Sequence, residues 1–285
     1  MRVSMSVKTF NKDEFVNDIW NKKPEIYKIP FNLNFNNNID ELSSLALEED
    51  ANSRAIIFEK NDFSKFSYLK GPFNESDLKG LPSDKPWSLM IQDLEEYLPE
   101  LNEIKKFFGF IPEVFHEDIM GVICGENGTT GPHLDWYHVF IIPIIGKKTW
   151  KIESRFTKET EFDQRIFKNE DLKILKNFEA GTEFCLSPGE LLYIPPGLGH
   201  HATSLNTSLS LSFGVKGPRL NLLLDVLYTK FMEKIHEDQR VGIDLSKSEH
   251  ISASSILGIP QEFQKLLGMD NIENLILEAR NWEGY

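Results

Sequence analysis

The sequence predicts a mainly β protein with helical additions, in which a barrel or sandwich of antiparallel strands lies between a helical lead and a helical tail. Two observations predict this class. Between about residue 109 and Pro218, apolar stretches are short or alternate with polar residues, and turns such as GENGTTGP and PPGLG separate them. On both sides of this region, apolar residues recur at helical spacing instead.

The bulk composition indicates one large domain or two small ones with a substantial core. The chain has 285 residues, of which 40% are hydrophobic and 12% aromatic. The formal net charge of −13 argues against direct binding to nucleic acid, since a nucleic-acid binder normally presents a basic face. An acidic chain attracts basic partners electrostatically, although its charge also serves solubility alone.

Cysteine usage and the apolar stretches predict a cytoplasmic protein without a membrane segment. Cys124 and Cys185 are the only cysteines, so no disulfide framework is expected. The N-terminal stretch MRVSMSVKTF lacks the apolar core of a signal peptide. The longest apolar stretch, Val139–Ile145, is far too short to cross a bilayer.

The N-terminal region is predicted to combine short helices with an extended segment. Residues 11–20 carry apolar side chains at helical spacing behind Asn11, a residue type that caps helices. KPEIYKIPF predicts an extended segment, and residues 39–50 predict another short helix. Residues 85–108 predict one or two further helices with a break near Pro99.

Short stretches bounded by turns predict the strands of the core. In SLSLSFGV, residues 208–215, the serines fall on one face and the leucines and phenylalanine on the other, as in a half-buried strand. Pro143 is unusual inside a predicted strand, because proline removes a ladder donor and prefers edges or bulges. The predicted strands are Asp118–Cys124, Val139–Ile145, Thr149–Glu153, Glu183–Leu186, Glu190–Ile194 and Ser208–Val215.

After Pro218 the helical spacing returns. Residues 219–240 place leucines and other apolar side chains on one stripe, and PQEFQKLLG and NIENLILEARNW predict two shorter helices. The stripe suits a homodimer contact, but packing on the chain's own barrel would use the same stripe. The predicted domains are an N-terminal helical and extended region packing on the barrel, 1–95, the β core, 96–218, and a C-terminal helical region, 219–285.

The pattern His-any-Asp occurs at three places and offers metal ligands at only some of them. Residues two apart lie on the same face of a strand, whereas on a helix they point about 200° apart. His236/Asp238 lies in the predicted helical tail and cannot chelate. His116/Asp118 begins a predicted strand but has no further ligands nearby, so a polar strand entry explains it.

His133/Asp135, in GPHLDWYHVF, differs because a second turn can supply a third ligand. The turn PPGLG delivers the adjacent His200 and His201, which must point to opposite faces of an extended segment. His200 closes the turn and is the predicted ligand, which leaves His201 beside the site or exposed. Two histidines and a carboxylate with open positions form the set that binds Fe(II) in non-haem oxygenases.

Lys148 and nearby aromatic residues extend the predicted site. A lysine one strand along the barrel could receive the far carboxylate of a 2-oxo diacid whose near end chelates iron, because a buried charge requires a partner. The competing interpretation is a surface lysine at a Gly-Lys-Lys turn. Trp136, Tyr137 and Trp150 could flank a substrate side chain. Trp150 is equally well explained as core, and His138 has the wrong parity for a ligand.

Two long motifs carry a resemblance to a known family. GPHLDWYHVFIIPIIGKKTWKI together with LSPGELLYIPPGLGHHATSLNTSLSLSFGVKGP resembles the bacterial cupin-like JmjC oxygenases. The most similar group within that family hydroxylates ribosomal proteins and includes an arginine hydroxylase, and animal relatives hydroxylate ribosomal-protein histidines. The resemblance covers roughly residues 10–220. It implies a double-stranded β-helix, the jelly roll of cupins, with Fe(II) and 2-oxoglutarate in the mouth of the barrel.

The resemblance also implies roles for individual residues. His133, Asp135 and His200 match the iron ligands, and Lys148 matches the residue that binds the distal carboxylate of 2-oxoglutarate. The arginine hydroxylases have arginine in place of this lysine, and lysine forms a point contact where arginine forms a fork. The resemblance therefore implies the same co-substrate in a pocket of somewhat different shape.

Two further contacts and the activity follow from the same resemblance. Cys124 and Ser212 lie on strands that line the family's pocket and are candidate 2-oxoglutarate contacts. The predicted function is an Fe(II)- and 2-oxoglutarate-dependent oxygenase that consumes O2 and hydroxylates a residue of a protein substrate, with an arginine or histidine of a ribosomal protein as the candidate target. A basic polypeptide fits both the resemblance and the acidic charge.

Two alternatives stay open. One is oxidation of a small molecule or a biosynthetic peptide by the same chemistry. The other is a cupin-like protein that holds a metal without turnover. The family's ribosomal hydroxylases continue into dimerisation helices and a winged-helix module, and the residues after Pro218 leave room for the helices but hardly for the module.

Overall fold

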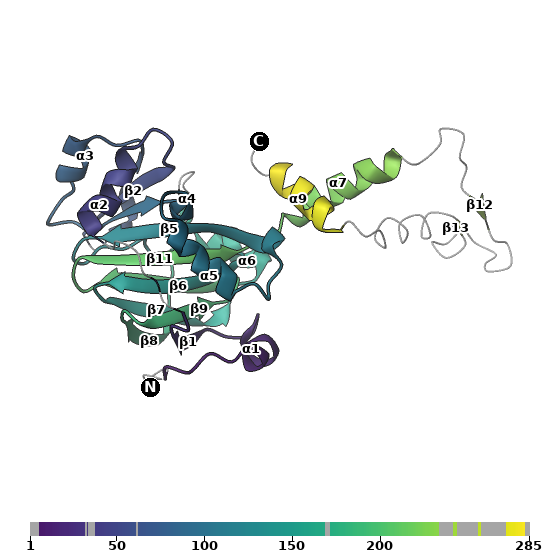
Figure 1. Ribbon diagram of the computed structural model, residues 1–285, viewed down its shortest axis with the longest axis horizontal. Helices are drawn as coiled ribbons and strands as arrows, with labels where there is room; N and C mark the ends of the chain where they lie inside the picture. Colours follow the sequence, from purple (N-terminus) through teal and green to yellow (C-terminus); the bar gives the residue numbers. More distant parts are fainter. Residues whose placement is uncertain are drawn as a thin grey trace. The chain divides into compact units, whose positions relative to one another are not determined.

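The computed structural model describes residues 6–31, 33, 38–60, 62–168, 172–233, 242–243, 256–257 and 272–282. The chain divides into two compact units, Met1–Lys216 and Gly217–Tyr285. The first unit is built around two antiparallel sheets (Figure 1). The boundary that the sequence predicts after residue 95 is a division inside this first unit and stays a prediction.

The larger sheet has eight strands in the order β1-β9-β6-β11-β5-β4-β2-β3, and the smaller has three in the order β10-β7-β8. The larger sheet contains β1 Glu25–Lys28, β2 Ser53–Glu59, β3 Asp62–Lys70, β4 Trp87–Ile91, β5 His116–Cys124, β6 His138–Ile145, β9 Glu190–Ile194 and β11 Ser208–Val215. The smaller contains β7 Lys148–Phe156, β8 Ala180–Leu186 and β10 Leu198–Ser204. This mainly β, cupin-like arrangement is the fold class that the sequence predicts.

Short helices cover one face of the larger sheet. Figure 1 shows α4 and α5 lying across β5 and β11. The Asn11 side chain accepts the backbone N–H of Glu14 at 3.0 Å, so it caps the first helix as the sequence predicts. The helical segments of this unit are α1 Lys12–Glu14, η1 Phe15–Ile19, α2 Ile39–Ser44, η2 Leu45–Leu47, α3 Glu75–Lys79, α4 Leu94–Tyr97, η3 Pro99–Leu101, α5 Asn102–Phe107, η4 Glu113–Phe115 and α6 Glu159–Arg165.

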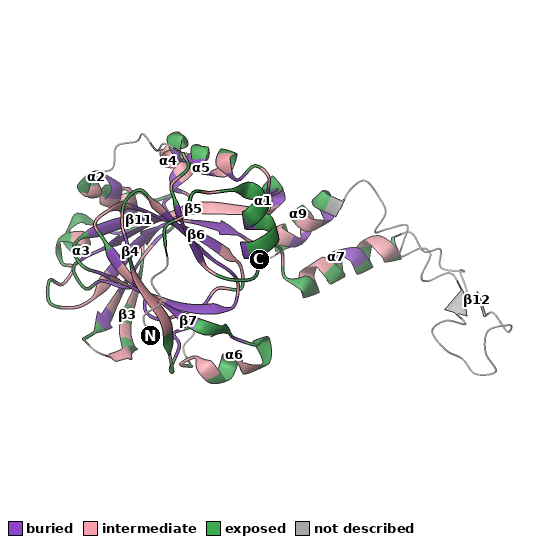
Figure 2. Ribbon diagram, turned by 90° about the horizontal axis from the view of Figure 1, so that it is seen from below, coloured by how far each residue is buried: buried purple, intermediate pink, exposed green. Residues whose placement is uncertain are grey.

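The alternation of β11 assigns its two faces to different surroundings. Its apolar residues join an aromatic-rich core beneath the helices, which also contains Phe108 and Phe140. Its serines at 210 and 212 face the space between the two sheets instead. Figure 2 shows most of β6 and β11 in the purple of buried residues, whereas α6 is largely exposed or intermediate. The predicted separation of serines from apolar side chains is confirmed.

One predicted helix is wrong, because residues 87–91 form the strand β4. This strand lies between β2 and β5, and four of its five residues are buried. A strand buried on both faces has a continuous apolar sequence, which period alone does not distinguish from a buried helix. Helices do follow in α4 and α5, and the predicted break at Pro99 is confirmed. The strands β2, β3 and β10 were not predicted.

Pro143 lies where a strand tolerates proline. It is paired with Ser210 of β11, next to an irregularity in register between Leu209 and Ser210. On the other side of β6, β9 pairs only with Val139–Ile141 and ends before the proline. The missing N–H of Pro143 therefore falls at a bulge and beyond the β9 ladder.

The second unit contains α7 Leu220–Met232 and α9 Ile272–Trp282, with the two-residue strands β12 Gly242–Ile243 and β13 Ile256–Leu257. Val226 and Leu227 of α7 pack with Leu275 and Ala279 of α9. Both helices lie in predicted segments. The predicted helix at 260–268 and the pair His236/Asp238 lie outside the described residues. None of the described helices combines the length and hydropathy that crossing a membrane would require.

Candidate metal centre and pocket

Backbone hydrogen bonds bring the two predicted turns together. The N–H of His133 donates to the carbonyl of His200 at 3.0 Å, and the N–H of His200 donates to the carbonyl of His133 at 2.8 Å. The N–H of Gly197 donates to the carbonyl of Asp135 at 2.7 Å. His133 and His200, far apart in the sequence, thus form an antiparallel bridge. This bridge places the three predicted ligands side by side.

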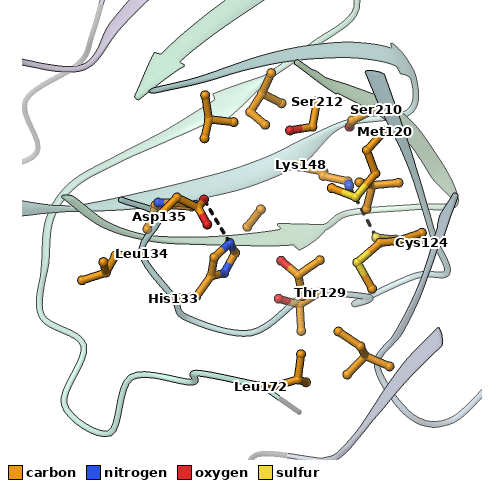
Figure 3. Close-up of a pocket in the computed structure, with 18 of the residues that line it drawn as sticks. Met120, Cys124, Thr129, His133, Leu134, Asp135, Lys148, Leu172, Ser210 and Ser212 are labelled. Carbon is orange, nitrogen blue, oxygen red and sulfur yellow. Dashed lines mark hydrogen bonds and ion pairs between the residues drawn. The ribbon is translucent and has the colours of Figure 1, made fainter. Parts of the chain in front are cut away.

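The two histidine rings are oriented by carbonyl groups. Nδ1 of His133 donates to the Gly131 carbonyl at 2.8 Å, and Nδ1 of His200 donates to the Leu198 carbonyl at 3.0 Å. Because a carbonyl only accepts, Nδ1 carries the hydrogen and Nε2 presents a lone pair. The two Nε2 atoms lie 3.9 Å and 3.6 Å from Oδ2 of Asp135. Figure 3 shows His133 and Asp135 facing each other.

The donor set fits a divalent transition metal. One potential ligand atom from each of His133, Asp135 and His200 lies within 4.8 Å of the others. Burial, reinforced by the neighbouring His133, lowers the pKa of His200 to about 4, so its imidazole is neutral at neutral pH. A neutral imidazole pair with one carboxylate suits Fe(II) and leaves coordination positions open.

The other histidines lie outside this cluster. His201 points away, with its ring against Phe63 at 5.0 Å and Phe178 at 5.9 Å between centroids. His138 stacks on Trp20 at 3.6 Å, and its Nδ1 lies 2.9 Å from the Tyr193 hydroxyl. The pair His116/Asp118 is not part of the three-residue cluster.

A cavity of about 300 Å³ lies next to the three residues, between the two sheets. Lys148 lines it with only 6% of its surface exposed, so the interpretation of a surface lysine is wrong. Its Nζ lies 3.4 Å from Sγ of Cys124. Within the described part of the chain, no carboxylate pairs with this ammonium. Cys124 and Ser212 also line the cavity (Figure 3).

The predicted aromatic contacts divide into two groups. Tyr137 lines the cavity, and the neighbouring Asp135 carboxylate, together with burial, raises the pKa of its phenol. Trp136 is 43% exposed, packs edge-on against Phe162 at 5.5 Å, and is not among the cavity-lining residues. Trp150 lines the cavity and also belongs to the core between the sheets, so its core position is confirmed and its contact with a substrate stays a prediction.

Several cavity residues come from strands that the sequence did not predict as strands. Arg54 reaches the cavity from β2, and its guanidinium donates to Oε1 of Gln92 at 2.5 Å. Met90, on β4, lines the same wall. For β2 the sequence offers the apolar stretch SRAIIFE, which directly follows the polar turn residues EEDAN. Thr129 and Thr130 enter from the GENGTTGP loop.

A buried ion pair supports the turn that carries His200. The Arg165 guanidinium at the end of α6 pairs with Glu153 of β7, whose side chain is 4% exposed. Arg165 also donates to the Asn177 carbonyl at 3.2 Å. The Glu153 carboxylate lies against Gly199, where an added Cβ would come within 2.3 Å of Oε2. Glycine at this position lets the carboxylate lie directly behind the ligand turn.

Comparison with protein families finds a match for the part of the chain that contains the site. Residues 106–223 match the model of the JmjC domain family. This range contains the three ligand candidates, Lys148, Cys124 and Ser212.

Curated relatives match most of this chain. A probable ribosomal oxygenase of Haemophilus influenzae is 30% identical over 82% of this chain and 55% of its own length. The ribosomal protein uL16 3-hydroxylase of Escherichia coli is 31% identical over 76% of this chain and 55% of its own length. The chain therefore spans about half the length of the curated relatives it matches.

Solved structures show the same fold. YcfD, a ribosomal oxygenase from Escherichia coli solved in complex with cobalt and 2-oxoglutarate, is similar with a TM-score of 0.63 and 26% identity, covering 96% of this chain and 68% of that one. Another crystal structure of YcfD gives a TM-score of 0.66 at 26% identity, covering 99% of this chain and 69% of that one.

Proposed function

We propose, from the match of residues 106–223 to the JmjC domain family, that this chain is an Fe(II)- and 2-oxoglutarate-dependent oxygenase that hydroxylates a residue of a protein substrate. One observation carries the proposal. His133, Asp135 and His200 converge at a cavity that also contains the buried ammonium of Lys148. A cation-binding set and an anion-binding group in one pocket suit a metal-chelating dicarboxylate.

The chain's own residues divide the work of binding. His133, Asp135 and His200 would hold the metal, and Lys148 would pair with the distal carboxylate of 2-oxoglutarate. Cys124 and Ser212 would flank the same co-substrate. When bound, Fe(II) supplies the reaction of O2 with 2-oxoglutarate that gives succinate and CO2 and hydroxylates a C–H bond.

The sheets around the cavity serve orientation and exclusion of water. Val139, Ile141 and Trp150 line the cavity, and all three are buried. An apolar lining keeps bulk water from the reacting groups and strengthens the charge pairing at Lys148. Tyr137, at the cavity, and the exposed Trp136 are the residues that we assign to contact with the substrate.

A ribosomal protein is the proposed substrate class, with an arginine or histidine side chain as the target. Two considerations support it. The curated relatives include a probable ribosomal oxygenase and a uL16 hydroxylase. The net charge of −13 also favours a basic polypeptide partner. The proposal places the protein in the cytoplasm, where it would act as a homodimer through the second unit.

Succinate formation tests the activity. Purified protein supplied with Fe(II), ascorbate and 2-oxoglutarate is expected to form succinate, and His133→Ala is expected to lose it. His201→Gln is the matched control, because this adjacent histidine points away from the cluster. If the native protein neither binds 2-oxoglutarate nor forms succinate, the oxygenase proposal fails.

Mass spectrometry of ribosomal proteins tests the substrate. Ribosomal proteins from cells lacking this chain, incubated with the active enzyme, are expected to gain the mass of one oxygen atom on one arginine or histidine. Succinate formation without any such modified peptide would reject the ribosomal substrate and leave the oxygenase chemistry standing.

A further inference from the structure

Lys148 and Cys124 meet across the cavity from different sheets. Lys148 is the first residue of β7 in the smaller sheet, and Cys124 is the last residue of β5 in the larger one. Their Nζ and Sγ atoms are 3.4 Å apart, and Figure 3 shows the contact at one end of the pocket. Both residues are more than nine-tenths buried, with exposed fractions of 6% and 1%.

The Lys148 ammonium and the Cys124 thiol are each other's polar contact at this end of the cavity. In the described part of the chain, the thiol is the hydrogen-bond partner of the ammonium and no carboxylate neutralises it. A buried ammonium beside a sulfur atom is an unusual end for a pocket, because buried cations are ordinarily paired with anions. The pair is reached through the cavity that it lines, so small oxidants that enter the cavity can reach the sulfur.

We propose that Lys148 and Cys124 form an oxidative modification site, at which hydrogen peroxide joins Nζ to Sγ through a single bridging oxygen atom. The geometry favours this product. A bridging oxygen spans the gap after a small approach of the two side chains, whereas a direct nitrogen–sulfur bond requires a much larger one. The cysteine would be held in a covalent link that further peroxide cannot turn directly into sulfinic acid.

The chemistry balances with two molecules of peroxide. The first oxidises the Cys124 thiol to a sulfenic acid and leaves as water. The second removes one hydrogen from the sulfenic O–H and one from the neutral Lys148 amine, and leaves as two waters while the N–O bond forms. Sulfur and nitrogen each lose two electrons, and the four electrons reduce the two peroxide molecules. The proton of the original ammonium goes to solvent.

The link would switch off the co-substrate end of the pocket, a consequence that rests on the proposed function. It converts the ammonium of Lys148 to a neutral nitrogen, so the distal carboxylate of 2-oxoglutarate loses its charge partner. It also fastens β5 to β7 across the cavity. Reduction by dithiols returns the amine, the thiol and one water, so the change is reversible.

Intact mass measurement tests the modification without assuming any activity. The protein is prepared metal-free in a Cys185→Ser background, because Cys185 is exposed and would oxidise on its own. Peroxide is expected to add the mass of one oxygen atom minus two hydrogen atoms, and dithiothreitol is expected to remove it. Peptide mapping is expected to join the peptides that contain residues 124 and 148.

Variants separate the link from ordinary oxidation. Cys124→Ser and Lys148→Arg are each expected to abolish the mass change. Peptide mapping of the protein that keeps both Lys148 and Cys124 tests the link directly, so the result does not depend on a variant that could misfold. Sulfinic or sulfonic acid at Cys124 with no joined peptide, or a link to any residue other than Lys148, overturns the proposal.

A binding measurement tests the consequence. Manganese-loaded protein carrying the link is expected to bind 2-oxoglutarate at least tenfold more weakly than the reduced protein, with full recovery after dithiothreitol. A link that forms without changing this affinity would reject the switch and would count against Lys148 as the co-substrate anchor. Failure of the link to form would leave the oxygenase proposal untouched.

Discussion

The two faces of the larger sheet are built from the same strands and have opposite contents. One face is covered by helices and filled with rings, and the fully buried Phe140 lies 4.1 Å from Phe108 and 5.2 Å from Tyr193 between ring centroids. The other face presents Met120 and Ser212 to a cavity of about 300 Å³.

The difference shows how a strand with a period of two residues can serve two purposes. Alternate side chains of β6 and β11 contribute to a close-packed core and to a hollow that can accept ligands. A filled face gains dispersion contacts that a hollow face lacks. Substitutions on the filled face should therefore change stability, and those on the hollow face should change binding.

The largest effect is expected on the filled face. Phe140→Ala should lower the free energy of unfolding by about 3–5 kcal/mol, because it removes a fully buried ring and leaves a cavity among other rings. Urea unfolding followed by circular dichroism measures this. A loss below about 1 kcal/mol would show that this face is not the main source of stability.

On the hollow face, Lys148→Ala should weaken binding of 2-oxoglutarate to manganese-loaded protein by about tenfold to a hundredfold, since a charge-assisted contact in a buried pocket is lost. Isothermal titration gives the affinity. Lys148→Arg keeps the positive charge and should therefore retain more of the affinity for 2-oxoglutarate than Lys148→Ala does. Equal affinity in the alanine variant and the unsubstituted protein would contradict the assigned anchor.

Acid should act on the filled face through His138, which stacks on Trp20. Burial lowers the pKa of His138 to about 4, below its ordinary value of about 6.5, so the unfolded chain takes up a proton more readily than the folded one. The contribution of neutral His138 to the unfolding free energy is complete above about pH 6.5 and is lost as the pH falls toward about 4.

The variant His138→Gln tests whether His138 causes this loss of stability in acid. Between about pH 7.5 and about pH 5.5, His138 should account for a loss of about 1 kcal/mol in unfolding free energy, and His138→Gln should reduce the loss by that amount. Urea unfolding at both pH values gives the difference. An unchanged pH dependence in the variant would mean that His138 is not the responsible group.

The smallest effect on stability is expected from Ser212→Val on the hollow face. The side chain is half-buried beside the cavity, so the added methyl groups have room and the unfolding free energy should change by less than about 1 kcal/mol. Binding of 2-oxoglutarate should fall in the same variant because the cavity becomes smaller. If stability drops as much as in Phe140→Ala, the two faces do not differ as the packing indicates.

Local patterns predicted much of the core. The alternation in SLSLSFGV and the turns SPGE and PPGLG correctly indicated β11, β9 and the approach to His200. The prediction of a helix at residues 87–91 is wrong, because β4 is buried between two neighbouring strands and its sequence shows no alternation. Its strand character depends on pairing with β2 and β5, which no local window contains.

The same limit applied to the candidate site. The sequence favours His200 over His201 because His200 closes the PPGLG turn and adjacent residues of an extended segment point to opposite faces, and the structure places His200 in the three-residue cluster. Arg54 and Met90 were missed, since they reach the cavity from strands whose place in the larger sheet was not recognised. The sequence places Trp136 next to Tyr137, and only the tertiary structure shows that Trp136 packs on Phe162 outside the cavity, so its contact with the substrate stays a prediction.

By itself, the sequence determined the residue types of the site and the side of each strand on which they lie, because the strand period is a property of the backbone. Only the tertiary structure decided that His133 and His200 share a backbone bridge and that Lys148 meets Cys124. These contacts join residues distant in the chain. They follow from how the two sheets close on each other, which depends on the packing of all the strands together.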